Sequence, residues 1–133
     1  MHEFSTMQMI LNSVLEAAEA RGADKILEIR LKIGSLTFLN PEQLGFAFSV
    51  LSKDTLAEDA KLKISIVKPK IKCLDCGYIG RGKYEGPEIH VLGVPVSIKC
   101  EKCGSRNIKF IHGRECEIKS ISILIKDEKK PHV

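Results

Sequence analysis

Apolar side chains recur every three or four positions in two stretches of the chain, which is the spacing of an amphipathic helix. In the first stretch, residues 4–20, the recurring apolar positions are Phe4, Met7, Leu11, Val14, Leu15 and Ala18. The second stretch opens at Asn40-Pro41-Glu42, where Asn40 can cap a helix and Pro41 suits its first position. Its apolar positions are Leu44, Phe46, Ala47, Phe48, Val50 and Leu51. The sequence therefore predicts two helices that each bury one face.

Three other stretches alternate between apolar and polar residues, which is the pattern of a strand with one buried face. In residues 27–33 the apolar positions are Leu27, Ile29, Leu31 and Ile33, and in residues 62–66 they are Leu62, Ile64 and Ile66. The third stretch, residues 116–125, alternates with a slip near Ser120, which is typical of a β-bulge. Three half-buried strands need a shared sheet.

Four cysteines interrupt this pattern before the third strand. The fold class we predict is therefore α+β: a small three-stranded sheet with two helices, plus an inserted, zinc-ribbon-like module that carries the four cysteines. The predicted domains are residues 1–69 together with 111–133, and residues 70–110. A module of about 40 residues buries too little apolar surface to fold alone, so a metal would supply much of its folding free energy.

The cysteines form two C-x2-C-G motifs, Cys73 with Cys76 and Cys100 with Cys103, separated by 23 residues. Two such turns supply four soft ligands in a tetrahedron, which suits zinc, and the glycine after each pair tolerates the positive φ that such a turn often needs. The motifs therefore predict a structural zinc site. Disulfides are the alternative, but Met1-His2-Glu3 leads straight into a helical pattern without a signal peptide, which favours a reducing, cytoplasmic compartment. Iron in a rubredoxin-like site would use the same ligands.

Composition and charge narrow the possible functions. Of the 133 residues, 44% are hydrophobic and the formal net charge is +4. No apolar run approaches the about 20 residues that a membrane helix needs. Residues 68–109 hold nine Lys or Arg and four Asp or Glu, so they carry the positive excess. Lys72, Lys99 and Lys102 lie beside the cysteines and can balance the negative charge of four thiolates, which we favour over nucleic-acid contact because only Tyr78 and Tyr84 add aromatic rings.

Met1-His2-Glu3 is a second candidate metal site. The α-amino group, the His2 backbone nitrogen and the imidazole can close chelate rings around one metal. Nitrogen ligands in a tetragonal arrangement suit Ni(II) or Cu(II), and Glu3 could add a carboxylate. The amine and the imidazole must both be deprotonated to bind, so such a site weakens as the pH falls. The simpler explanation of these residues alone is a random histidine at a frayed terminus.

Several motifs stand in order along essentially the whole chain. They are the opening Met1-His2-Glu3, the strand end Leu31-Lys-Ile-Gly34, Pro41-Glu-Gln-Leu44 with Phe46-Ala-Phe48, both C-x2-C-G motifs, and Gly113-Arg-Glu-Cys-Glu-Ile118. Together these motifs resemble those of the HypA/HybF family of hydrogenase nickel-incorporation proteins. The resemblance implies a nickel metallochaperone and not an enzyme. It implies transient Ni(II) cargo and a structural Zn(II), and it implies two partners, the GTPase HypB and the large subunit of [NiFe]-hydrogenase. The rival interpretation is a zinc-ribbon nucleic-acid-binding or scaffold protein, which would be indifferent to His2.

The resemblance also implies roles for particular residues. His2 is the main nickel ligand, with the Met1 amine, backbone nitrogen and Glu3 beside it, and the four cysteines bind zinc. The segment between the cysteine pairs is longer than in short members of the family and carries His90, a further candidate nickel ligand whose alternative is a surface position. Some relatives have an aspartate near position 40, where this chain has Asn40, and we expect Asn40 to be a helix cap. We expect Cys116 to be a small core residue.

Overall fold

The computed structural model describes residues 2–85 and 97–126, and within them the chain divides into two compact units. The described residues of the first unit are 2–33, 38–66 and 116–126, and those of the second are 34–37, 67–85 and 97–115. The chain therefore passes from the first unit to the second between residues 66 and 67, and returns between residues 115 and 116. The sequence pattern placed these boundaries at 69/70 and 110/111. The second unit also takes the short 3-10 helix Ser35–Thr37.

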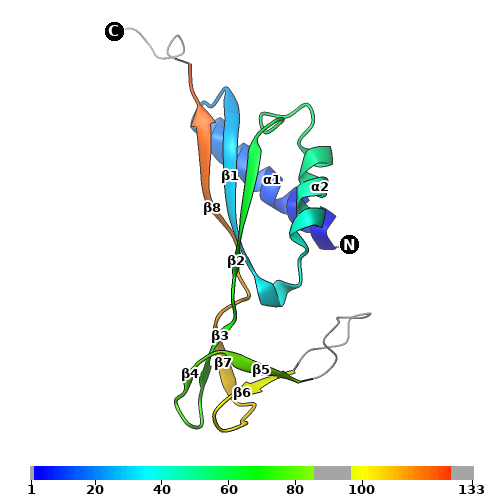
Figure 1. The fold of residues 1–133 in the computed structure, drawn as a ribbon. Helices are drawn as coiled ribbons and strands as arrows, with labels where there is room; N and C mark the ends of the chain where they lie inside the picture. Colours follow the sequence, from blue (N-terminus) through cyan, green and yellow to red (C-terminus); the bar gives the residue numbers. More distant parts are fainter. Residues whose placement is uncertain (1, 86–96, 127–133) are drawn as a thin grey trace, which may run out of the picture. The chain divides into compact units, whose positions relative to one another are not determined.

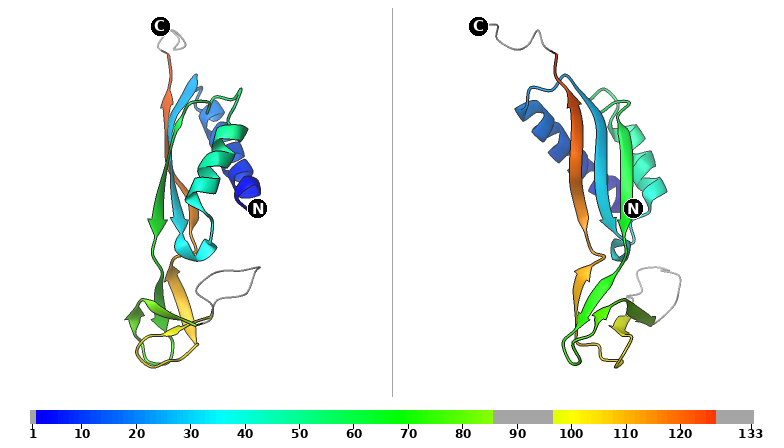
Figure 2. Two further views of the ribbon diagram at one scale, coloured as in Figure 1. Left: turned by 45° about the vertical axis from the view of Figure 1, so that its right-hand side comes forward. Right: turned by 60° about the vertical axis from the view of Figure 1, so that its left-hand side comes forward.

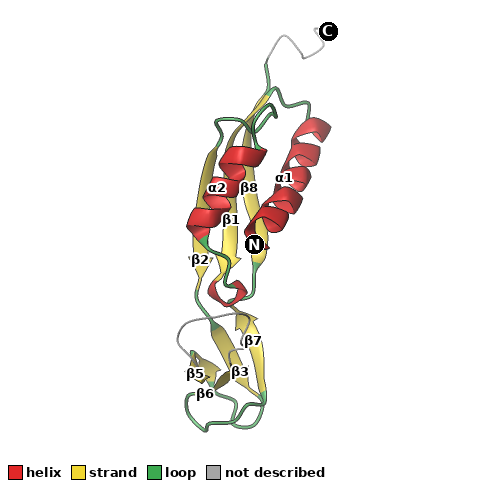
Figure 3. Ribbon diagram, turned by 90° about the vertical axis from the view of Figure 1, so that its right-hand side faces the viewer, coloured by secondary structure: helices red, strands yellow, loops and turns green. Residues whose placement is uncertain are grey.

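The first unit is a three-stranded sheet covered by two helices. The strand order is β2 (Lys61–Val67), β1 (Lys25–Gly34), β8 (Cys116–Leu124), and β1 and β8 are antiparallel. Helices α1 (His2–Ala20) and α2 (Pro41–Leu51) lie side by side on one face of this sheet (Figure 1, Figure 3). Together with the module that carries the four cysteines, this architecture confirms the predicted α+β class.

The hydrophobic core lies between this face of the sheet and the two helices. Figure 2 shows these two layers with the sheet seen from its edge. Its largest fully buried side chains in this unit are Met7, Leu11, Val14, Ile26, Ile29, Leu31, Ile33 and Leu44. The opposite face of the sheet is polar: Glu28 pairs with Arg30 at 2.8 Å and with Lys63 at 3.2 Å. The first unit thus holds itself together by apolar burial between two layers.

Two irregularities in the pairing of β1 with β8 change which side chains reach the core. One bulge confirms the predicted slip, because Arg30 pairs with Ser120 and Leu31 pairs with Ile118, which leaves Lys119 without an opposite residue. A second irregularity falls between Ile26 and Glu28. There Ile26 takes the core position at 0% exposure and Leu27 is 44% exposed, so the prediction that Leu27 is buried was wrong.

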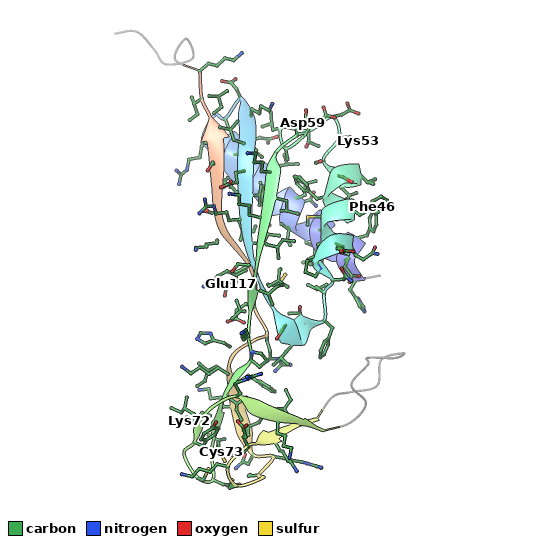
Figure 4. The ribbon with its side chains drawn as sticks, in the orientation of Figure 1. Phe46, Lys53, Asp59, Lys72, Cys73 and Glu117 are labelled. Atoms are coloured by element: carbon green, nitrogen blue, oxygen red, sulfur yellow. The ribbon has the colours of Figure 1, made fainter. Side chains whose placement is uncertain are left out.

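Two apolar residues of α2 also differ from the prediction. The buried stripe of this helix consists of Leu44, Ala47 and Phe48, which follow one another at three- and one-residue steps. Phe46 and Val50 lie four residues apart on the other flank and are 59% and 43% exposed. Figure 4 shows Phe46 projecting from α2 away from the sheet.

The second unit is built from short strands. β3 (Lys70–Cys73) pairs on one side with β4 (Ile79–Gly80) and on the other with β7 (Ile108–His112), both antiparallel. β5 (Gly82–Glu85) and β6 (Ser97–Cys100) form a separate antiparallel pair. Among the described residues of this unit, the buried apolar side chains are Ile71, Cys73 and Cys100. So small a core cannot stabilise the unit by apolar burial alone.

No helix in the described part of the chain is long and apolar enough to cross a membrane.

Candidate metal centres

The two C-x2-C-G motifs fold into two tight loops of the same shape. In the first loop, residues 73–77, the N–H of Gly77 donates to the carbonyl of Cys73 at 3.0 Å, and in the second loop, residues 100–104, the N–H of Gly104 donates to the carbonyl of Cys100 at the same distance. Gly77 and Gly104 have φ values of 78° and 75°, which a residue with a Cβ adopts only under strain. The predicted role of both glycines is therefore confirmed.

Strand ends hold the two loops in place. Cys73 ends β3 and Cys100 ends β6, so the first cysteine of each loop is fixed by a strand and is almost fully buried. Cys76 and Cys103, at the far side of each turn, are exposed. Both first cysteines also receive backbone hydrogen bonds at sulfur, from Cys76 to Cys73 at 3.4 Å and from Cys103 to Cys100 at 3.4 Å.

The four sulfur atoms converge on one point. Sγ of Cys73 lies 3.5 Å from that of Cys103, and Sγ of Cys76 lies 3.6 Å from that of Cys100. All four ligand atoms lie within 4.8 Å of one another. Around a tetrahedral zinc with bonds of about 2.3 Å, neighbouring sulfurs would be about 3.8 Å apart. The cysteines are free and not paired as disulfides, and their donor set fits a tetrahedral metal ion.

The electrostatics of this cluster favour a cation. The N–H of Cys76 lowers the pKa of the Cys73 thiol to about 7. Burial works against the Cys100 thiolate, but the N–H groups of Cys103 and Lys102 outweigh it and lower the pKa of that thiol. At Cys103 the backbone of Ser105 favours the thiolate, but the neighbouring Cys73 sulfur and burial outweigh it and raise the pKa to about 12. A cation held between the four sulfurs would favour the thiolate form of all four cysteines.

Polar side chains outside the ligand set connect the two loops, a role that no sequence motif predicted. Asp75 of the first loop accepts hydrogen bonds from Ser105 and Asn107, which follow the second loop. Glu101 of the second loop accepts one from the Tyr78 hydroxyl at 3.2 Å. Polar residues at these positions in a C-x2-C turn are common surface residues, so only the folded geometry reveals the contacts.

At the other candidate site, His2 is the first residue of α1 and its side chain is exposed. Glu3 follows it in the first turn, and its Oε2 accepts the Asn40 N–H at 3.0 Å. The side chain of Asn40 accepts from the N–H groups of Glu42 and Gln43, at 2.8 and 3.2 Å. Asn40 is therefore the cap of α2, as predicted, and it ties the start of α2 to the start of α1. Met1 and His90 lie outside the described residues.

Cys116 is exposed, so the prediction that it is a core residue was wrong. It pairs with buried Ile33, but β8 is an edge strand of the sheet. Beside that edge lies a hollow of about 390 Å³, which Cys116 lines together with Met9 and Ile118. The pattern of alternation indicated the correct face of the strand, but it could not show that α1 leaves this end of the edge uncovered.

Two of the motifs that carry the family resemblance contact each other through their backbones in the second unit. The N–H of Gly34 donates to the carbonyl of Glu115 and the N–H of Leu36 donates to that of Gly113, both at 2.7 Å. Gly113 has a φ of 115°, and a Cβ there would lie 2.9 Å from Cα of Pro69. The glycines of Leu31-Lys-Ile-Gly34 and Gly113-Arg-Glu-Cys-Glu-Ile118 thus allow two backbone segments to touch.

Comparison with known proteins agrees with this geometry. Residues 1–123 match the family model described as "Hydrogenase/urease nickel incorporation, metallochaperone, hypA". The hydrogenase maturation factor HypA of Methanopyrus kandleri is 40% identical, with 96% of each chain covered, and that of Methanothermobacter thermautotrophicus is 42% identical, with 96% of this chain and all of the relative covered.

Two solved structures resemble almost the whole chain. The solution structure of a HypA protein has a TM-score of 0.65 at 25% identity and covers 95% of this chain and 98% of its own. The solution structure of the Ni metallochaperone HypA from Helicobacter pylori has a TM-score of 0.63 at 26% identity and covers 93% and 98%.

Proposed function

Because this chain belongs to the HypA family of hydrogenase/urease nickel-incorporation metallochaperones, we propose that it binds Ni(II) and delivers it to a [NiFe]-hydrogenase during maturation. The observation that carries this proposal is the family match, which begins at residue 1 and so includes Met1-His2-Glu3. A zinc-ribbon nucleic-acid-binding or scaffold protein would need only the cysteine module, whereas the match extends over both units.

The proposed nickel ligands are the Met1 amine, the backbone nitrogen and imidazole of His2, Glu3 and His90. The place of His2 in the helix supports this assignment, because the first N–H groups of an α-helix have no partner within the helix. A backbone nitrogen there can lose its proton and bind a metal without breaking a helix hydrogen bond. The imidazole is exposed and can be reached by a partner that takes the metal. Glu3 would ligate by exchanging its hydrogen bond with the Asn40 N–H or by using its other oxygen.

The proposed zinc ligands are the four cysteines of the two loops. The sulfur distances support zinc, and the second unit buries so few apolar side chains that metal binding would supply much of its folding free energy. Four cysteine ligands leave zinc no open position for a substrate or water. We therefore propose a structural zinc and a carrier without catalytic activity.

The proposed partners are the GTPase HypB and the large subunit of the hydrogenase. Exposed apolar side chains on the helices of the first unit support docking of a protein near the proposed nickel site. Phe4 is 40% exposed and Met9 71%, and the Phe4 ring meets the ring of Phe46 edge to face at a centroid distance of 6.1 Å. Apolar side chains exposed next to a metal site provide contact area for the protein that receives the metal.

Titration of Ni(II) into the zinc-loaded chain with its native amino terminus tests the proposal. A change outside the ligand shell typically raises a metal Kd about tenfold, and we expect His2→Ala to raise the nickel Kd by more than that. It should also abolish the absorption of square-planar Ni(II). The matched control is His112→Gln, because His112 Nδ1 already contacts Glu115 at 2.9 Å and is not a proposed ligand. An unchanged nickel affinity and spectrum in His2→Ala would refute the nickel assignment.

Two further samples test individual nickel ligands. A chain with residues added before Met1 lacks the free α-amino group at that position and should bind nickel more weakly. His90→Ala should also weaken nickel binding, because His90 is a proposed ligand. Zinc content should stay the same in all these samples, because the two sites share no ligand.

A further inference from the structure

The two cysteine loops are joined by two reciprocal hydrogen bonds between side chains that are not metal ligands. In one, Asp75 of the first loop accepts from the Ser105 hydroxyl, and Asn107 Nδ2 adds a hydrogen bond to Asp75 Oδ1 at 3.3 Å. In the other, Glu101 of the second loop accepts from the Tyr78 hydroxyl at 3.2 Å. Tyr78 and Ser105 each stand two residues after the last cysteine of their own loop. We refer to these two hydrogen bonds, Ser105 to Asp75 and Tyr78 to Glu101, as the cross-loop links.

The donors of both links are held in place by their surroundings. The Ser105 hydroxyl accepts the N–H of Asn107 at 3.0 Å, and the carbonyl of Asn107 accepts the N–H of Leu74 in the first loop at 2.9 Å. The Tyr78 ring lies against Gly80, where an added Cβ would be 2.7 Å from Cζ of the ring. These contacts hold each donor beside its acceptor, so each link joins the two loops.

Charge balance does not explain why the acceptors Asp75 and Glu101 lie beside the cysteines. Four thiolates around one Zn²⁺ carry a formal charge of −2, and Asp75 and Glu101 each add a further negative charge nearby. Negative charges that lie close together repel one another. The two carboxylates therefore need another reason to be here, and the hydrogen bonds that they accept from the opposite side of the site provide one.

We propose that the cross-loop links position the four cysteines for zinc, by holding the two loops together before the metal binds. The inference rests on the proposed zinc assignment. Loops that are already joined lose less freedom when zinc binds, so the links lower the zinc Kd and slow zinc release. Zinc then stays in place while the carried metal comes and goes.

The test uses the full chain and measures zinc affinity and release by competition with a chromophoric chelator. Ser105→Ala and Tyr78→Phe each remove one hydroxyl donor without changing the charge. We expect each to raise the zinc Kd about tenfold and to speed release, and the double variant to show about the product of the two effects. Ser105→Thr keeps a hydroxyl and should restore the affinity of the parent.

Matched controls separate the links from general effects. Ser49→Ala removes a hydroxyl that donates to the Phe46 carbonyl in α2, and it should leave the zinc Kd unchanged. The Co(II)-substituted chain reports ligand geometry directly, and its absorption bands should broaden or shift in the two link variants. Nickel affinity should be the same in all of them.

The inference is overturned if both single variants bind zinc within about twofold of the parent, or if Ser105→Thr binds as weakly as Ser105→Ala. If Ser105→Ala does not fold, Tyr78→Phe decides the question by itself, because it keeps the ring that packs on Gly80. A parent chain that does not retain zinc would refute the zinc assignment and the inference with it. A parent that retains zinc while the variants behave like it would refute only the inference.

Discussion

The close backbone contact between Gly34 and Gly113 predicts that Gly34→Ala is severely destabilising. A Cβ on Gly34 would overlap the carbonyl carbon and oxygen of Gly113 and would stand 2.6 Å from the backbone nitrogen of Arg114. All of these atoms belong to the backbone, so no side chain can rotate to make room. The two segments must move apart.

The cost follows from the contacts that this movement breaks. The hydrogen bonds from Gly34 to Glu115 and from Leu36 to Gly113 are both 2.7 Å long, and each is worth about 1 kcal/mol net, or more if its donor stays buried without a partner. Forcing an extra carbon into close packing adds about 1–3 kcal/mol. We therefore expect Gly34→Ala to lower the free energy of unfolding by about 3–5 kcal/mol.

Urea unfolding of the zinc-loaded chain, followed by far-UV circular dichroism, measures this loss, and hydrogen exchange at the Leu36 amide reports it locally. Gly45→Ala is the matched control, because Gly45 lies inside α2 and a Cβ there meets nothing within 4 Å. It should stabilise the chain by about 0.5–1 kcal/mol, since alanine favours a helix interior. If Gly34→Ala stays within about 0.5 kcal/mol of the parent, the close backbone contact does not exist as described.

Two further predictions concern single polar side chains. Asn40→Ala should destabilise the chain by about 1 kcal/mol in thermal unfolding, because Glu42 and Gln43 lose the acceptor of their N–H groups, while nickel affinity should not fall; a loss of nickel binding would instead make Asn40 a ligand. Burial raises the pKa of the Glu115 carboxyl, but the N–H groups of Gly113 and Glu115 and the His112 side chain together outweigh it and keep that pKa below its ordinary value of 4.5. The stabilisation is therefore complete above pH 4.5 and lost as the pH falls through the lowered pKa. Glu115→Gln should therefore flatten the acid side of the stability profile, and an unchanged acid side would contradict this assignment.

The sequence by itself determined the two helices and three strands of the first unit, the fold class and the convergence of the cysteines, whereas the short strands of the second unit were not predicted. These features depend on local rules: the period of apolar residues, the cap at Asn40 and the turn that a C-x2-C-G motif makes. The four cysteines could be grouped from their spacing alone, because two loops of this kind offer four soft ligands that a single metal can satisfy.

Only the tertiary structure decided which apolar positions face the core and what surrounds the metal ligands. Leu27 is displaced by a bulge, and Cys116 is exposed because α1 leaves the end of an edge strand uncovered. The links between the cysteine loops join residues 23 and 30 positions apart, which no local pattern relates. The physical reason is the same in each case: periodicity reports the direction of a side chain from its own backbone, whereas burial and hydrogen bonding depend on what another segment places opposite it.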